Sequence, residues 1–292
     1  MNPLATMNRW PWYGRWPLKV SLFGLTILVV CFPYPRMLAR NLARWGDPDR
    51  LIEPEHPRLG AWIAELRAGL PAGTNHDETL HAVQRFVYEK VPYEWDWNTW
   101  GVADYLPTVA EVLDQGREDC DGRAVVAASL LRNLGYDAHL VNDLTHVWVR
   151  TEVGDTLSPG TAPIITRTDE GRQFRLPSLA ESARAAGVGI AVFPASREVV
   201  IVFVFWLLLI RPGTGWPWAV GGAALLIASL VLHRLGGSSL QHDTLPITTT
   251  LGTVCLIAAV AMLIVAGNLA THRARSTAHP RASAAGPASP SV

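Results

Sequence analysis

The chain of 292 residues balances 25 basic against 25 acidic side chains, so its formal charge is zero at pH 7. This balance lacks the excess of Lys and Arg with which proteins neutralise phosphates, and no nucleic-acid partner is expected. The length corresponds to about two domains, and three cysteines leave no room for a disulfide-rich framework.

Four apolar runs predict membrane-spanning helices at residues 18–34, 194–212, 216–232 and 247–269. A helix needs about 20 apolar residues to cross a hydrocarbon core of about 30 Å. The second run reaches that length only if Pro194 occupies its first turn. Tryptophans at the edges of the runs are typical of membrane–water interfaces; they are Trp10, Trp12, Trp16, Trp206, Trp216 and Trp218. We therefore expect a multi-pass protein of the cell membrane, in contact with lipid.

The first run is also compatible with a cleaved signal peptide, but "CFPYPRMLAR" after it offers no small-x-small cleavage site, which favours an uncleaved anchor. Four spans place residues 1–17 and 270–292 on the same side. Both segments are basic, so both termini are predicted to be cytoplasmic and residues 35–193 to lie outside. A basic cluster directly after the first run favours the opposite orientation; it consists of Arg36, Arg40 and Arg44. The Ala-, Pro- and Ser-rich segment 270–292 is predicted to be a disordered tail.

The soluble block 35–193 begins with helical patterns and continues with strand patterns, which predicts an α+β domain. Helices are expected at 36–45, 56–70, 74–91, 108–116 and 120–135, with a long aromatic loop at 92–107. Asn75 and Glu78 have the spacing of a capping box. Strands are expected at 137–143, 146–151, 155–159 and 163–168, with a hairpin turn at Val153–Gly154.

The helix predicted at 120–135 has small and apolar residues on every side, so we expect it to be buried in the middle of the domain. Cys120 stands at its first turn, where the helix dipole lowers the pKa of a thiol and opposes the repulsion from Glu118, Asp119 and Asp121. His146, at the start of a strand, completes the minimal pair of nucleophile and base. The alternative is that Cys120 is a small core residue and His146 a satisfied strand residue. Zinc bound by Cys120, His139 and His146 is not expected, because paired ligand spacing is missing.

Four segments of this block resemble the core of the transglutaminase-like superfamily: "LPTVAEVL", "DCDGRA", "LLRNLGYDAHLV" and "HVWV". The resemblance covers about 76–165. It implies a papain-like fold in which Cys120 is the nucleophile and His146 is the base. Neither a cofactor nor a metal is expected. It further implies a protein or peptide substrate whose carboxamide or peptide bond reacts through a thioester, by acyl transfer, deamidation or proteolysis.

The third catalytic position departs from the family pattern. An "L-D-P" step usually supplies an Asp that orients the His, whereas this chain reads Leu157-Ser158-Pro159. Ser158 or a backbone carbonyl could orient the ring, Asp155 could do so after a shift of register, or no third member acts. The departure leaves open a catalytically weak or inactive domain that binds peptides or organises an envelope assembly.

Trp95, Trp97 and Trp100 precede the central helix and could wall a cleft for the substrate; core packing explains each of them equally well. Transport by the apolar helices is not favoured, because their interiors hold almost no ionisable residues. The sequence leaves the oligomeric state, the substrate and the acyl acceptor undetermined.

Overall fold

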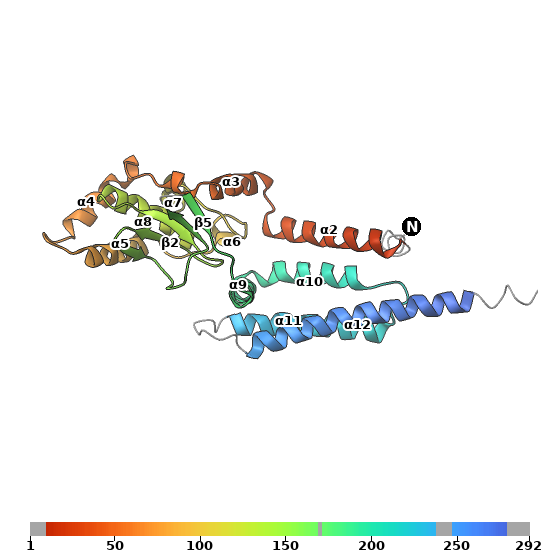
Figure 1. Ribbon diagram of the computed structural model, residues 1–292. Helices are drawn as coiled ribbons and strands as arrows, with labels where there is room; N and C mark the ends of the chain where they lie inside the picture. Colours follow the sequence, from red (N-terminus) through yellow and green to blue (C-terminus); the bar gives the residue numbers. More distant parts are fainter. Residues whose placement is uncertain (1–9, 169–170, 238–246, 279–292) are drawn as a thin grey trace, which may run out of the picture. The chain divides into compact units, whose positions relative to one another are not determined.

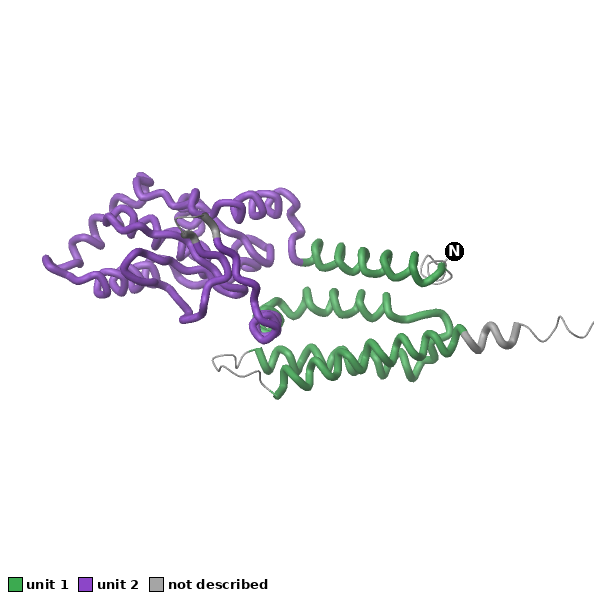
Figure 2. The backbone as a smooth tube through the Cα atoms, viewed as in Figure 1, with its two compact units in different colours: residues 1–30, 187–292 green, residues 31–186 purple. Residues whose placement is uncertain are grey.

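The computed structural model describes residues 10–168, 171–237 and 247–278. The chain divides into two compact units, one formed by residues 31–186 and the other by residues 1–30 together with 187–292 (Figure 2). The first unit is α+β, and the second contains the long apolar helices (Figure 1).

Helices come first in the α+β unit, as the sequence predicts. Their bounds are α3 (Pro35–Trp45), η1 (Pro48–Leu51), η2 (Pro57–Leu59), α4 (Gly60–Ala68), α5 (His76–Lys90), α6 (Asp96–Thr99), α7 (Val109–Gln115) and α8 (Cys120–Asn133). The predicted capping box of Asn75 and Glu78 is formed at the start of α5. Gly116 ends α7 with a φ of 65°, a conformation that glycine adopts without steric cost. The aromatic loop differs from expectation in containing the short helix α6.

A five-stranded antiparallel sheet follows, in the order β3-β2-β1-β4-β5. Its strands are β1 (His139–Asn142), β2 (Val147–Thr151), β3 (Gly154–Thr156), β4 (Ile165–Thr168) and β5 (Gly171–Phe174). The hairpin of β2 and β3 pairs Thr151 with Gly154, which agrees with the predicted turn. Strand β5 was not foreseen, because "GRQF" lacks the apolar alternation that identifies a half-buried strand.

Helix α8 is buried along its length, from Asp121 and Gly122 to Leu130 and Leu131. It contacts α5 and α7 as well as strands β1 and β2, so apolar residues are needed all round it. Trp148 and Val149 of β2 are fully buried in the same core. The central buried helix predicted from the sequence is therefore present in an α+β unit.

The second unit contains α2 (Trp12–Cys31), α10 (Ala195–Leu209), α11 (Trp216–Gly237) and α12 (Ile247–Ala278). Three segments have the length and apolar composition of membrane spans: Trp12–Cys31, Trp216–Gly237 and Ile247–Thr271. Helices α9 (Leu179–Val192) and α10 are together apolar enough to form a fourth, but they are bent by 116° at the break between them. These helices indicate a membrane protein.

Three boundaries differ from the sequence prediction. Helix α2 begins at Trp12, inside the predicted terminal segment 1–17, and it continues through Pro17, which lies within the helix. The 194–212 span is a 15-residue helix preceded by α9, which occupies the end of the predicted soluble block. Helix α12 extends to Ala278, into the predicted tail 270–292. Residues 1–9, 238–246 and 279–292 lie outside the described residues.

Gly122 offers a test of how tightly α8 is packed. A Cβ at this position would lie 2.4 Å from Cγ of Glu118 and 2.9 Å from Cγ2 of Val112. Because neither neighbour can move without disturbing the core, we expect Gly122→Ala to lower the free energy of unfolding by about 1–3 kcal/mol. Thermal melting of the detergent-solubilised protein measures the effect.

Gly60→Ala is the matched control. Gly60 lies at the start of α4 with a φ of −54° and with no atom within 4 Å of an added Cβ. The same substitution should here be neutral or stabilise by up to about 1 kcal/mol. Equal effects at the two glycines would contradict the close packing of α8 on Glu118.

Candidate active site

Cys120 is the first residue of α8. Its neighbour Asp119 caps the helix, because Oδ1 of Asp119 accepts the backbone N–H of Asp121 at 3.1 Å. Cys120 is partly buried, and its sulfur accepts a hydrogen bond from the backbone N–H of Val147. Val147 directly follows His146, so the thiol lies beside the start of the strand that carries the predicted base.

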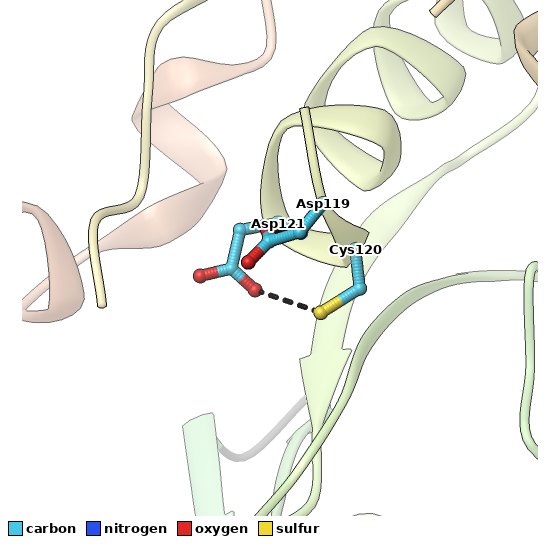
Figure 3. Close-up of side chains that lie close together, drawn as sticks. All are labelled: Asp119, Cys120 and Asp121. Atoms are coloured by element: carbon cyan, nitrogen blue, oxygen red, sulfur yellow. Dashed lines mark hydrogen bonds between the residues drawn. The ribbon is translucent and has the colours of Figure 1, made fainter. Parts of the chain in front are cut away.

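The thiol itself donates to Oδ1 of Asp121 at 3.3 Å, and Figure 3 shows the sulfur and this carboxylate facing each other. Burial raises the pKa of Cys120 well above its usual value, and the negative charges of Asp121 and Asp119 raise it further. The sequence led us to expect a lowered thiol pKa. That expectation is wrong for this state, because desolvation and two adjacent carboxylates outweigh the helix dipole.

The His146 ring is oriented by a backbone carbonyl: its Nε2 lies 3.2 Å from the oxygen of Leu157. Since a carbonyl can only accept, Nε2 carries the proton and Nδ1 is left as the basic nitrogen. Burial lowers the pKa of His146, which keeps the ring neutral near pH 7. In this state no hydrogen bond joins His146 to Cys120, since the thiol donates to Asp121.

Leu157, which supplies that carbonyl, has a φ of 61°. The left-handed conformation costs a branched residue about 1 kcal/mol or more, and such strain persists only where the surroundings enforce it. Here the side chain is 4% exposed in the core, and the backbone N–H donates to Oε1 of Gln84 at 3.3 Å. The strained turn directs the carbonyl of Leu157 to the imidazole.

The two side chains considered as orienters of His146 contact other groups. Ser158 is exposed, and its Oγ accepts from the backbone N–H of Gly160 at 3.2 Å. Asp155 accepts from Nε1 of Trp148 at 2.9 Å and pairs with Arg150. Of the alternatives left open by the sequence, the backbone carbonyl is the one that contacts the ring.

Asp143 shapes the turn that presents His146. Its Oδ1 accepts the backbone N–H groups of Thr145 and His146 at 2.6 and 2.8 Å, and its Oδ2 accepts the hydroxyl of Thr161. An Asp that bonds backbone two and three residues ahead stabilises a tight turn. The "ND" before "LTH" is a turn signal, but it did not identify Asp143 as the residue that positions the base.

Carboxylates crowd the N-terminal end of α8: Asp96, Asp104, Glu118, Asp119 and Asp121. All but Asp104 are buried. Burial and mutual repulsion raise the pKa of Glu118 to about 8, of Asp119 to about 7 and of Asp96 to about 11. Oδ1 of Asp96 and Oδ2 of Asp121 are buried and have no hydrogen-bond partner among the described residues.

The same side chains could hold a hard cation. Oxygens of Asp96, Asp104 and Asp121 lie within 4.8 Å of one another, which matches the span of oxygen ligands bound at about 2.4 Å. These carboxylates therefore either keep protons near pH 7 or require a positive ion. His139 is not a member of such a group, since it pairs with Asp49 and Asp137 at 3.1 and 3.0 Å.

The aromatic loop 92–107 contacts Glu118, the residue directly before Asp119, which caps α8. The backbone of Glu118 bonds to Pro92 and Glu94, and its carboxylate accepts from Nε1 of Trp100. Trp100 therefore packs inward, with its ring 4.8 Å from that of Tyr105. Trp95 and Trp97 stack on each other at 4.8 Å and are partly exposed, as a cleft wall requires.

Two further residues near the thiol were not singled out in the sequence. The charge of Cys120 is among the causes that raise the pKa of Tyr93, although burial is the largest. The guanidinium of Arg123 lies 4.9 Å from the Tyr93 ring and 4.7 Å from that of Tyr88. Arg123 lies one turn after Cys120 on α8, and this spacing is the signal that could have identified it.

Comparison with protein-family models, curated proteins and solved structures finds no match to this chain.

The carboxylate cluster predicts an unusual dependence of stability on pH. Unfolded Asp and Glu ionise near pH 4, whereas Glu118 and Asp119 ionise in the fold near pH 8 and 7. The folded protein thus holds more protons between these values, so the free energy of unfolding should fall as pH rises from about 4 to about 8. Melting in chelator-treated buffers measures this slope.

Asp96→Asn should reduce the pH dependence of the free energy of unfolding by up to about 1.4 kcal/mol per pH unit, because the variant lacks one carboxyl group that keeps its proton in the fold. The amide can still accept from Tyr105 N–H, as Oδ2 of Asp96 does at 2.5 Å. Asp114→Asn is the control, since Asp114 pairs with Arg58 in solvent. A wild-type protein that becomes more stable between pH 5 and 8 would contradict the protonated cluster.

Proposed function

We propose that residues 31–186 form a transglutaminase-like cysteine enzyme, anchored in the membrane, that acts on carboxamide or peptide bonds through a thioester. The observation that carries the proposal is the meeting of the α8 N-terminus with the start of β2. There the Cys120 sulfur bonds to the N–H that follows His146, whose ring is held by the carbonyl of Leu157.

The reaction begins when Nδ1 of His146 takes the proton of the Cys120 thiol. The thiolate attacks the carbonyl carbon of the substrate, and the carbonyl oxygen becomes an oxyanion. The backbone N–H of Cys120 has no acceptor among the described residues and can stabilise that charge at the helix N-terminus. Collapse of the adduct expels ammonia or an amine, which takes the proton from His146 and leaves a thioester. Water or an amine then attacks the thioester and restores the thiol.

The carboxylates next to Cys120 set the condition under which this step can run. While Asp121 is ionised it accepts a hydrogen bond from the thiol, and its negative charge opposes formation of the thiolate. Burial and neighbouring carboxylates raise the pKa of Asp121, which favours its neutral form. With Asp121 neutral the repulsion is lost, and transfer of the thiol proton to His146 becomes less costly.

A non-catalytic peptide-binding domain is the second candidate, favoured by the raised thiol pKa and by a backbone carbonyl, rather than a carboxylate, at Nε2 of His146. In that case the paired rings of Trp95 and Trp97 supply binding surface, and Cys120 has no chemical role. The two candidates differ in one measurable property, namely whether His146 controls the reactivity of Cys120.

Alkylation of Cys120 distinguishes them. In full-length protein carrying Cys31→Ser and Cys255→Ser, we expect iodoacetamide to label Cys120 at a rate that His146→Ala lowers about tenfold or more at pH 7. Asp121→Asn should raise the rate about tenfold in the pH range where Asp121 is ionised, because loss of one adjacent charge shifts a pKa by about one unit, and should change it little where Asp121 is neutral. Intact-mass spectrometry over pH 5–9 gives the rates.

Three further variants complete the series. His139→Ala is the matched control for loss of an imidazole, since His139 is engaged by Asp49 and Asp137. Ser158→Ala and Asp155→Ala should keep the dependence on His146, because neither side chain contacts the ring. Ser158→Asp should preserve or raise the rate. If His146→Ala changes nothing at any pH, the enzyme proposal fails and the binding domain replaces it.

We also propose that both termini are cytoplasmic and that the α+β unit lies outside. Support comes from Arg15 and Lys19 at the start of α2 and Arg211 just past the end of α10. Topology reporters fused after Val292 and inserted after Gly160 should report opposite sides of the membrane. Signals from the same side would contradict this topology, and Arg36, Arg40 and Arg44 would then be the orienting cluster.

A further inference from the structure

A cavity of about 310 Å³ lies at one end of the helices in the second unit. Three basic side chains line it: Arg15 and Lys19 from α2, and Arg211 from the turn after α10. Two tryptophans, Trp12 and Trp16, form another part of the wall. In α2 the basic residues and the tryptophans each have the spacing of one helical turn, so each pair lies on one stripe of the helix.

The charges of Arg15 and Lys19 are not balanced by a carboxylate among the described residues of this unit. Glu198 is the only carboxylate in the described part of residues 10–30, 187–237 and 247–278, and it forms an ion pair with Arg234. Arg15 and Lys19 are nevertheless only 9% and 5% exposed. Burial of a charge without an opposite charge is costly, and more so near a bilayer.

Hydrogen bonds to neutral groups offset only part of the free-energy cost of burying these charges. Nζ of Lys19 donates to the carbonyl of Leu208, at the end of α10, where the helix dipole favours a cation. Arg211 donates to Oδ1 of Asn268. No side-chain acceptor for Arg15 is found among the described residues. The carbonyl that accepts from Lys19 carries no full negative charge, so the buried pair of Arg15 and Lys19 gives the cavity a strong preference for an anion.

The position of the cavity identifies the kind of anion. Arg15 and Lys19 lie in the first half of α2, and tryptophans at this level are typical of the headgroup region. Farther along α2 the apolar side chains Val20, Leu25 and Val29 are more than half exposed, which suits acyl chains. Pockets between spanning helices that gather Lys and Arg bind the phosphates of anionic lipids.

We propose that this cavity binds the phosphate headgroup of an anionic phospholipid, with Arg15, Lys19 and Arg211 as its ligands and the acyl chains along α2. The lipid supplies the missing negative charge and stabilises α2 in the helix bundle. The site is independent of the chemistry proposed at Cys120. The site agrees with the proposed topology, in which the start of α2 lies at the cytoplasmic leaflet, because anionic lipids are concentrated in that leaflet.

Lipid titration of the full-length protein in neutral detergent tests the proposal, with the melting temperature as readout. Phosphatidylglycerol should raise it in a saturable manner, and phosphatidylcholine should not. Arg15→Gln and Lys19→Gln should each weaken the apparent affinity roughly ten- to a hundredfold, the value of one charge-assisted hydrogen bond. Arg197→Gln, at the opposite end of α10, removes a charge outside the cavity and should leave the affinity unchanged.

Three controls keep the outcome decisive. Without lipid, Arg15→Gln and Lys19→Gln should melt at or above the wild-type temperature, because each removes a buried, uncompensated charge. Glycerol 3-phosphate distinguishes a soluble phosphate from a lipid. If it raises the melting temperature as much as phosphatidylglycerol does, the cavity binds phosphate but the proposal of a lipid ligand is wrong. Equal responses of the cavity variants and Arg197→Gln, or of the two phospholipids, would overturn the site altogether.

Discussion

The burial of helix α8 on every side is the constraint on which the α+β unit depends. A helix in this position can present only small or apolar residues, so the run from Ala124 to Leu131 fills the core between α5, α7 and the sheet. Gly122 is required where the first turn passes Glu118. Because the helix cannot move without opening the core, its N-terminus fixes Cys120 against β2. The precision of the candidate site therefore depends on the packing of α8.

The same burial creates the electrostatic conflict around the thiol. Carboxylates that would repel one another weakly in water are placed at the end of α8 with little solvent. Protonation neutralises these carboxylates, and a bound cation would balance their charge. In both cases the carboxylates no longer repel a thiolate at Cys120. The reactivity of the cysteine and the charge state of the cluster are thus linked by position, without any contact beyond the hydrogen bond to Asp121.

The helical unit contains an unbalanced charge of opposite sign. Its described residues carry a single carboxylate, used by Arg234, while Arg15 and Lys19 are buried together. In the α+β unit protons can relieve the conflict, because carboxyl groups titrate within a few units of neutrality when buried. Arginine does not lose its proton in proteins, so the buried charge of Arg15 in the helical unit is not relieved in that way.

Local pattern alone determined most of the elements. The capping box at Asn75, the helix that ends at Gly116, the buried character of α8 and the hairpin at Val153–Gly154 were each predicted from the sequence, because a few neighbouring residues decide them. The apolar runs identified the membrane helices for the same reason. The start of α2 at Trp12 and the bend between α9 and α10 were not predicted, since a proline such as Pro17 or Pro194 can stand within a helix or at its start.

Tertiary structure decided what the candidate residues contact. The sequence placed Cys120 and His146 at the starts of a helix and a strand, but it offered Ser158, Asp155 or a carbonyl as partners of the imidazole. The carbonyl of Leu157 is the group that contacts the imidazole. A strained turn, fixed by the buried side chain of Leu157, directs the carbonyl to the ring. The sequence likewise showed acids around Cys120 without showing that Asp96 and Asp104 join them. Burial and long-range contact set the thiol pKa and the charge balance, and both depend on residues far apart in the chain.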